Sequence, residues 1–375
     1  MRRTTISIRP GSKRNAKNWS SPLSVEVPKK PFLAGSLREE LAAWCVKECM
    51  AKFRANQIAE WLYKHGVIDP AEMKNLPLPL RGMLDSRFYA PGSRVTETAG
   101  TPGGTEKLLL ELFDGETIEM VLIPGREERL TFCLSTQVGC PVQCLFCASG
   151  RGGLVRNLSA GEMVEEFLLG SRRAGRRPDN IVFMGIGEGL LNFDELQKTL
   201  HILSAPEYFG MSPRRITVST SGYVPGMLKF AELGKEYTLA ISLHAPDDET
   251  RAKIIPGKVR YPISEIMAAA DRYLEKAGRM VTLEYTLLDG INDSPAAAQK
   301  MARLAREHHA KINLIPYNAT DSKFRRPSPK AIAEFEKMIS DAGAHVTVRT
   351  ERGSENAAAC GQLRARHGKH RAEKN

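Results

Sequence analysis

The sequence has no apolar run of about 18 residues, the length that a membrane-spanning helix requires. It also lacks the apolar segment and the small-residue cleavage site of a secretory signal, although its first residues are basic. Its seven cysteines form an odd, unevenly spaced set in a chain of 375 residues, unlike the framework of a disulfide-stabilised secreted domain. We therefore expect a cytoplasmic protein of about two domains, with reduced thiols and no membrane partner.

Acidic residues are scarce at both ends of the chain. Residues 1–30 contain eight Lys and Arg against Glu26, a net charge of +7, and residues 361–375 contain five against Glu373, a net charge of +4. These two segments account for the whole net charge of +11. Such tails are typical of arms that bind nucleic-acid phosphates, although solvated disordered tails and an N-terminal organelle transit peptide fit the same composition. We expect basic tails over residues 1–34, as a disordered segment, and 364–375.

The hydrophobic pattern predicts an α/β protein between these tails. Apolar residues at helical spacing indicate a small helical accessory domain over residues 35–100, of the helix-hairpin-helix kind. Two apolar runs around Asp114-Gly115 predict a connecting β-hairpin within residues 101–128. Residues 129–353 then alternate six strand-like runs with helical stretches, which predicts a partial (β/α)6 barrel with its active site at the C-terminal ends of the strands. The six runs are "LTFCLS", "NIVFMG", "RITVSTS", "YTLAISLH", "MVTLEYTLL" and "KINLIPY".

The stretch "GCPVQCLFCASG", residues 139–150, places Cys140, Cys144 and Cys147 in one loop after the first barrel strand. A structural zinc site needs four protein ligands, and neither a second C-x-x-C pair nor a nearby histidine supplies the fourth. Three thiolates suit a [4Fe-4S] cluster with one iron open to another ligand. Each cysteine alone could be a small buried residue, but the three together at this spacing predict a cluster site.

C-x3-C-x2-C on the first loop of a partial barrel resembles the radical S-adenosylmethionine (SAM) superfamily, and Phe146 fits the aromatic residue common before the third cysteine. The surrounding sequence resembles one family within it, the RlmN/Cfr RNA methyltransferases, over residues 35–363. The matching stretches include "FRANQIAEWLYKHG", "NLPLPLR", "CLSTQVGCPVQCLFCASG", "RNLSAGE", "FMGIGEGLLN", "TVSTSG", "LAISLHAPDDETR", "EYTLLDGIND", "NLIPYN" and "ACGQL". The resemblance implies methylation of carbon-2 or carbon-8 of an adenosine in 23S rRNA, with tRNA open as a further substrate.

The resemblance also implies roles for residues outside the cluster. Cys360, on a mobile loop at residues 354–363, matches the cysteine that accepts a methyl group from one SAM; a radical made from a second SAM then activates that S-methyl group. Cys133 matches the resolving cysteine, which forms a transient disulfide with Cys360. Glu119 matches a carboxylate proposed as the proton acceptor, although a strand glutamate is otherwise a solvated surface residue. The SAM contacts transfer by position to Gly187, Glu188, Ser219, Ser242, Leu243, His244 and Asn318.

The chain departs from the family pattern at two places. Gly189 replaces the proline of a G-E-P motif, which loosens that loop, and residues 354–357 differ from the usual acidic and apolar residues. The enzymes that act on carbon-8 also lack this proline, so both ring carbons stay open. The alternatives are a paralogue acting on another RNA and a non-catalytic RNA-binding iron-sulfur protein. We expect a monomer that receives electrons from flavodoxin or ferredoxin.

Overall fold

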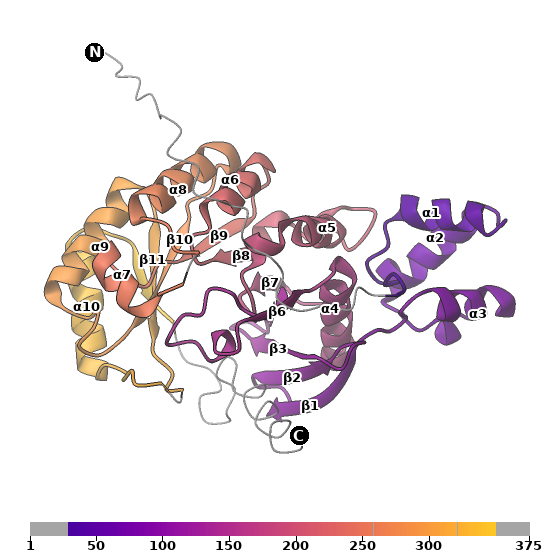
Figure 1. Ribbon diagram of the computed structural model, residues 1–375, viewed down its shortest axis with the longest axis horizontal. Helices are drawn as coiled ribbons and strands as arrows, with labels where there is room; N and C mark the ends of the chain where they lie inside the picture. The colour runs from indigo at the N-terminus through magenta and orange to yellow at the C-terminus, as the bar shows by residue number, and fades with distance from the viewer. Residues whose placement is uncertain (1–28, 258, 321, 350–375) are drawn as a thin grey trace, which may run out of the picture.

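The computed structural model describes residues 29–257, 259–320 and 322–349. Three helices form a lobe at one end of the long axis, namely α1 (Arg38–Lys47), α2 (Phe53–Ala59) and α3 (Leu78–Arg87) (Figure 1). A single π-helical segment, Glu60–His65, extends α2. The helices therefore end before the predicted boundary at residue 100, because β1 (Arg94–Gly100) already belongs to the sheet.

Cys45 and Cys49 in this lobe are four residues apart, and on a helix this spacing predicts that both lie in the core. In the structure their environments differ. Cys45 is fully buried in the lobe core, as expected, whereas Cys49 is exposed. The expectation for Cys49 is wrong because α1 ends at Lys47, so that Cys49 no longer continues the buried face of the helix.

A curved sheet of ten strands is the centre of the rest of the described chain, which also contains a small two-stranded sheet and seven α-helices. Its order is β1, β2, β3, β4, β7, β8, β9, β10, β11 and β12. The pairs β1–β2, β2–β3 and β3–β4 are antiparallel, whereas β4 and all later strands of this sheet pair in parallel. Their bounds are β2 (Glu106–Glu111), β3 (Thr117–Pro124), β4 (Leu130–Cys133), β7 (Asn180–Phe183), β8 (Ile216–Thr220), β9 (Thr238–Ser242), β10 (Thr282–Leu287), β11 (Lys311–Pro316) and β12 (Val346–Val348).

The six predicted barrel strands are all present, as β4 and β7 to β11, and they form the predicted partial barrel. The predicted hairpin is also present as β2 and β3, with Gly115 at φ 78° in its turn. However, the hairpin is more than a connector, because β3 hydrogen-bonds directly to β4 and thereby extends the barrel sheet. The sheet stays open, since within the described residues β1 and β12 are its two edges.

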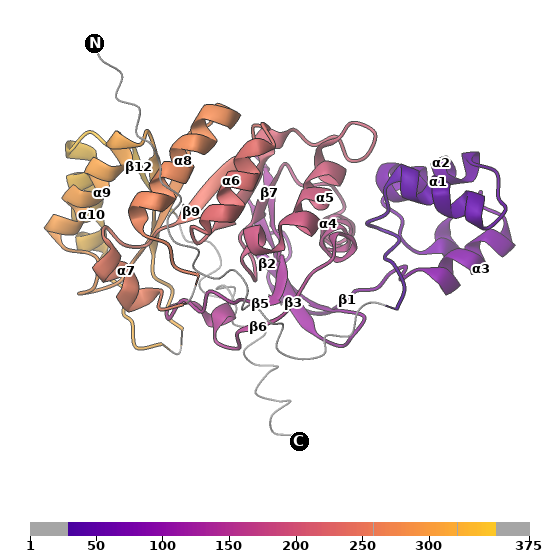
Figure 2. The same ribbon diagram turned by 45° about the horizontal axis from the view of Figure 1, so that its top comes forward.

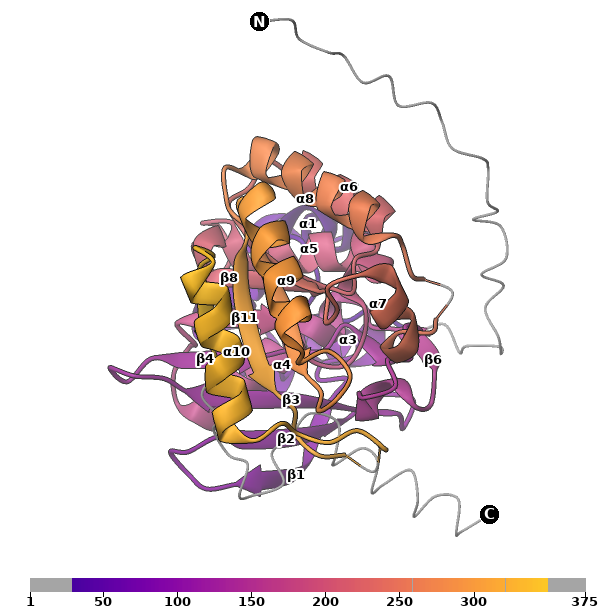
Figure 3. The same ribbon diagram turned by 90° about the vertical axis from the view of Figure 1, so that its left-hand side faces the viewer.

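The connecting helices lie on the outer face of the sheet, because strand order follows chain order and parallel connections share one hand (Figures 2 and 3). Ser159 and Glu162 form a capping box at the start of the first of them, and Gly175 at φ 69° ends it. The helices are α4 (Ala160–Ala174), α5 (Phe193–Ser204), α6 (Val224–Glu232), α7 (Asp248–Ile254), α8 (Ile263–Ala277), α9 (Pro295–Glu307) and α10 (Pro329–Asp341). No helix in the described ranges is long and apolar enough to cross a membrane.

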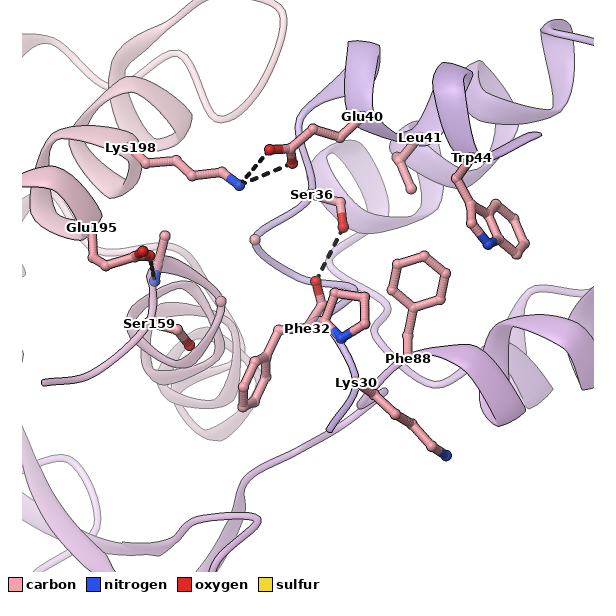
Figure 4. A pocket seen from close by; sticks show the side chains of 14 residues that line it. Lys30, Phe32, Ser36, Glu40, Leu41, Trp44, Phe88, Ser159, Glu195 and Lys198 are labelled. Atoms are coloured by element: carbon pink, nitrogen blue, oxygen red, sulfur yellow. Dashed lines mark hydrogen bonds and ion pairs between the residues drawn. The ribbon is translucent and has the colours of Figure 1, made fainter. Parts of the chain in front are cut away.

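The helical lobe is attached to the barrel beside α4 and α5. Lys198 on α5 donates to both carboxylate oxygens of Glu40 on α1, at 2.8 and 2.9 Å (Figure 4). The Arg38 guanidinium donates to the carbonyl of Glu207. The Tyr63 ring packs edge-on against the Tyr208 ring, with 4.9 Å between the ring centroids. A cleft of about 500 Å³ remains at this junction, and Figure 4 shows its lining. These contacts hold the lobe in one orientation on the barrel.

A buried ion network ties the hairpin turn to the start of α4. Arg156 is 7% exposed and donates to both oxygens of Glu162 at 3.0 and 2.8 Å. Its Nε donates to Asp114 in the hairpin turn at 2.6 Å, and its guanidinium lies over the Phe113 ring. Burial raises the pKa of Asp114, but the hydrogen bond and charge of Arg156 outweigh it, so the pKa lies below its usual value. The network fixes the hairpin on the barrel.

Candidate functional site

A cavity of about 370 Å³ opens at the C-terminal ends of the barrel strands. Residues at the ends of β4 and β7 to β11 line it, together with the cysteine loop and the inner face of β3. Of the residues that the sequence singles out, those that line it are Glu119, Cys133, Cys140, Cys144, Cys147, Gly187, Glu188, Ser219, Ser242, His244 and Asn318. Leu243 is fully buried and is not among the lining residues. Cys360 and most of both basic tails lie outside the described residues.

The cysteine loop is held at both ends by a small two-stranded sheet, β5 (Gln137–Gly139) and β6 (Leu154–Asn157). Gly139 has φ 78°, and a Cβ there would lie 2.0 Å from the carbonyl oxygen of Gly153, so only glycine fits. The Cys140 N–H donates to the same carbonyl at 2.9 Å. The loop also packs on a separate buried apolar cluster, formed by Val142, Ala245, Ile254, Ile255, Leu288, Tyr317 and Phe324.

The environment of the three thiols suits a cluster better than a single ion. Burial raises the pKa of Cys140 to about 12 and that of Cys144 well above its ordinary value, so a strong cation must be bound for both to ionise. No group of three His, Cys, Asp or Glu in the described ranges is placed to hold one metal ion. A [4Fe-4S] cluster does not need such convergence, because each thiolate binds a different iron. The loop and the cavity beside it therefore fit the cluster.

The "GIGEG" segment after β7 lies flat against residues 134–137. A Cβ at Gly187, which has φ 119°, would lie 2.7 Å from Thr136 Oγ1. The N–H of the next residue, Glu188, donates to Gln137 Oε1 at 2.8 Å. The Glu188 carboxylate is 3% exposed, and its Oε2 accepts the N–H of Ser221 at 2.6 Å. Burial raises the pKa of Glu188, so a cationic ligand in the cavity would stabilise its charged form.

Proline at position 189 is expected to be compatible with this structure. Gly189 begins a 3-10 turn, where a proline is well tolerated, and the backbone of Glu188 is extended, with φ −108° and ψ 98°. A Cβ at Gly189 would meet only the side chains of Leu196 and Thr136, at 3.3 and 3.4 Å. We expect G189P to raise the free energy of unfolding by about 0.4–1 kcal/mol, through a less flexible unfolded chain, and to leave SAM affinity equal or higher.

Denaturant unfolding and SAM titration check this prediction. The control is Gly189→Ala, which adds the Cβ without the proline ring. Loss of SAM binding in G189P alone would contradict the prediction.

His244 follows β9 and presents one ring nitrogen for a ligand. Its backbone has φ 58°, an unusual conformation for histidine. Its Nδ1 accepts the N–H of Thr286 at 3.0 Å, so the neutral ring carries its proton on Nε2. Burial, followed by the charge of Arg251, lowers the pKa of His244 to about 3. The ring packs edge-on against Phe146 of the cysteine loop, with 4.9 Å between the ring centroids. This contact joins the loop to the end of β9.

Two serines lie side by side on neighbouring strands of the same cavity. The hydroxyl oxygens of Ser219 on β8 and Ser242 on β9 are 3.4 Å apart. Both residues are half-buried, and both line the cavity. They can therefore offer paired hydroxyls to one polar ligand, as the strand-end position predicts.

Glu119 is buried, at 4% exposed, unlike a solvated strand residue. Lys107, on the neighbouring strand β2, lies 3.5 Å from its Oε2 and is itself fully buried. The Ser135 hydroxyl donates to the Glu119 carbonyl at 2.6 Å. Because β3 pairs with β4 through Val121 and Cys133, Glu119 and Cys133 reach the same cavity from adjacent strands.

Three charged residues of this region have no counterpart in the sequence prediction. They are Lys107, Arg251 and Glu284, and none follows a periodic polar pattern. Glu284 lines the cavity at 5% exposed, and the Asn313 side chain donates to its Oε2 at 2.7 Å. Burial raises the pKa of Glu284 to about 7. The available signal was that Glu284 is the charged residue inside the otherwise uncharged predicted strand "MVTLEYTLL".

Comparisons with known proteins agree with this site. The Radical SAM superfamily model matches residues 134–301, and the ribosomal RNA large subunit methyltransferase N-terminal domain model matches residues 33–89. A probable dual-specificity RNA methyltransferase RlmN from Akkermansia muciniphila is 39% identical, covering 91% of this chain and 97% of the relative. Another RlmN, from Opitutus terrae, is 42% identical, covering 92% and 97%.

A solved structure, a radical SAM methyltransferase from Sphaerobacter thermophilus, is 42% identical with a TM-score of 0.85, covering 88% of this chain and 98% of that one. Identity at this level over nearly the whole length of both chains leaves one conclusion. The chain belongs to the RlmN family of radical SAM RNA methyltransferases, enzymes that work with SAM and a [4Fe-4S] cluster.

Proposed function

We propose that the enzyme methylates carbon-2 of an adenosine in 23S rRNA, and in tRNA as a second substrate, through a methyl group carried on Cys360. The relatives from Akkermansia muciniphila and Opitutus terrae are named as dual-specificity RNA methyltransferases, which supports two RNA substrates. The observation that carries the proposal is the composition of one cavity. It is lined at once by the three loop cysteines and by Glu119 and Cys133, so radical formation and base chemistry would share one space.

Cys140, Cys144 and Cys147 would hold the cluster in this proposal, and the cavity beside them would hold SAM. When bound, SAM supplies first the methyl group for Cys360 and then, in a second molecule, the 5'-deoxyadenosyl radical that activates it. Glu188 binds the SAM amino group, since a buried carboxylate gains most from a cationic partner. His244 donates from Nε2, and the paired hydroxyls of Ser219 and Ser242 bind polar groups of the same ligand. Gly187 leaves room for SAM, and Asn318 lines the opposite side of the cavity.

Glu119 accepts the proton that leaves the methylated ring carbon. Its carboxylate lies inside the cavity, and the Nζ of the fully buried Lys107 lies 3.5 Å from its Oε2. The Cys133 thiolate would then attack the Cys360 sulfur, so that an S–S bond forms while the bond from that sulfur to the transferred carbon breaks. The electron pair of the broken bond goes to that carbon, which takes up a proton and becomes the methyl group of the released product. A cytosolic thiol reductant restores both cysteines for the next turnover.

The chain geometry is compatible with Cys360 as the carrier. Arg349, the last described residue, itself lines the cavity. Cys360 lies eleven residues further along the sequence, outside the described residues. Since an extended chain spans up to about 3.6 Å per residue, this tether allows about 40 Å, which more than covers the cavity.

The remaining parts of the proposal concern partners. The enzyme works in the cytoplasm as a monomer and takes electrons from flavodoxin or ferredoxin. The helical lobe and the two basic tails contact the RNA, because phosphate contacts by Lys and Arg supply affinity without sequence preference.

The decisive experiment is peptide mass spectrometry after anaerobic reconstitution with iron, sulfide and SAM. Trypsin cuts after Arg352 and Arg364 and isolates "GSENAAACGQLR", which contains Cys360. We expect a methyl mass shift on this cysteine that disappears when SAM is omitted and in Cys360→Ala. An unmodified thiol in protein that holds the cluster and binds SAM would rule out the methyl carrier and favour a non-catalytic RNA-binding protein.

A further inference from the structure

Arg251, on α7, is the largest side chain that the described core buries completely. Its guanidinium donates only to backbone carbonyls, at Leu243 (3.3 Å), Tyr261 (3.3 Å) and Ser221. It forms no ion pair with a carboxylate of residues 29–257, 259–320 or 322–349. A buried charge without a direct ion pair is costly, so a function that requires the charge is expected here.

The helix that carries Arg251 is packed against the cysteine loop. The N–H of Leu145, between two of the loop cysteines, donates to the carbonyl of Ile254 at the end of α7, at 3.0 Å. Ile254 belongs to the apolar cluster on which Cys144 also packs. A second link runs through Ser221, whose carbonyl accepts from Arg251 and whose N–H donates to Glu188. Arg251 therefore lies behind the wall of the cavity, on the helix that packs against the cysteine loop.

The electrostatics of the site point the same way. Burial lowers the pKa of Arg251 to about 10, an effect that a Cys144 thiolate, Asp248 and Glu188 oppose, so the side chain stays charged at neutral pH. The charge of Arg251 likewise acts against the burial that raises the pKa of Cys144. Three thiolates around a [4Fe-4S] cluster give an anionic assembly, and one added electron makes it more negative. A fixed cation at this position stabilises the reduced form most.

We propose that Arg251 is the fixed countercharge of the cluster and raises its reduction potential, so that one electron from a flavodoxin or ferredoxin enters more readily. The step adds one electron to the cluster and moves no proton. The inference rests on the proposed ligation by Cys140, Cys144 and Cys147. It makes Arg251 a positioning residue, since the guanidinium contacts carbonyls and lies outside the cavity lining.

The test is a redox titration with dithionite, followed by electron paramagnetic resonance, on the full reconstituted chain. It compares the wild type with R251K, which keeps the charge, and with R251Q and R251M, which remove it. We expect the neutral variants to reduce at least about tenfold less favourably, a fall in midpoint potential of about 59 mV for a one-electron couple. R251K should stay close to the wild type although it loses carbonyl contacts.

Each outcome separates the inference from the proposed function. If the wild type takes up no cluster, the assignment of Cys140, Cys144 and Cys147 as cluster ligands is wrong. A wild type with a cluster, together with neutral variants of unchanged potential, would overturn the role of Arg251 alone. Equal shifts in R251K and R251Q would also overturn it, since lost contacts would then be the cause. If only the charged variants assemble a cluster, the countercharge is supported, and thermal unfolding of each apoprotein shows that the chain is folded.

Discussion

Replacement of Cys144 by alanine is expected to remove most of the iron and to reduce RNA methylation below detection. Cys144 lies in the middle of the loop that Gly139 and Gly153 close, and it is half-buried against the apolar cluster of the site. Water is a poor substitute for a thiolate ligand of iron, and the other cysteine of the cavity, Cys133, is held on β4 outside the loop. Iron and sulfide content, the electron paramagnetic resonance spectrum and methyl transfer from labelled SAM measure the loss.

The matched control is Cys49→Ala. Cys49 is exposed in the helical lobe and far from the loop in sequence, so its removal should leave iron content and activity unchanged. Full iron content in Cys144→Ala would mean that the loop is not the cluster site. Equal losses in both variants would indicate a general effect of cysteine removal on reconstitution.

Arg156→Met is expected to lower the free energy of unfolding by about 3–5 kcal/mol. The substitution leaves the Glu162 carboxylate, 1% exposed, without its bidentate partner and removes the anchor of Asp114 in the hairpin turn. An unpaired buried carboxylate costs far more than the lost contact alone, because burial disfavours its charge. Urea unfolding of the purified protein gives the value.

The control variant is Arg172→Met, which removes an exposed arginine of α4. Arg172 pairs with Glu72 at 3.3 Å, but the two side chains are 74% and 46% exposed. Exposed pairs contribute about 0–1 kcal/mol, so this variant should unfold almost like the wild type. If Arg156→Met were as mild as Arg172→Met, the network would not anchor the hairpin.

The strands that the sequence predicts are those whose side chains are buried. β10 and β11 read as apolar runs because they cross the core. β1 was placed in the helical segment since most of its side chains are exposed, and "RVTETAG" therefore shows no apolar period. β12 is only three residues long, too short for a periodic signal, and its pairing with β11 defines it.

The site divides in the same way. Motif residues such as Glu188 and His244 were predictable because their types and spacing match a family, and the structure brings both to the cavity. Lys107 and Arg251 were not, since an isolated basic residue normally indicates solvent exposure. Their burial depends on partners from other strands and loops, which no local pattern contains.

The direct pairing of β3 with β4 makes the hairpin and the barrel a single cooperative unit. The hydrogen bonds between β3 and β4 break cooperatively. Glu119 therefore cannot move away from Cys133 unless this part of the sheet opens locally. The spacing between Glu119, the proposed proton acceptor, and Cys133, the proposed resolving thiol, is therefore set by strand register, independently of any bound RNA. Sequence changes in the hairpin turn, remote from the cavity, would then alter catalysis through the population of that local opening, without changing any residue that touches the substrate.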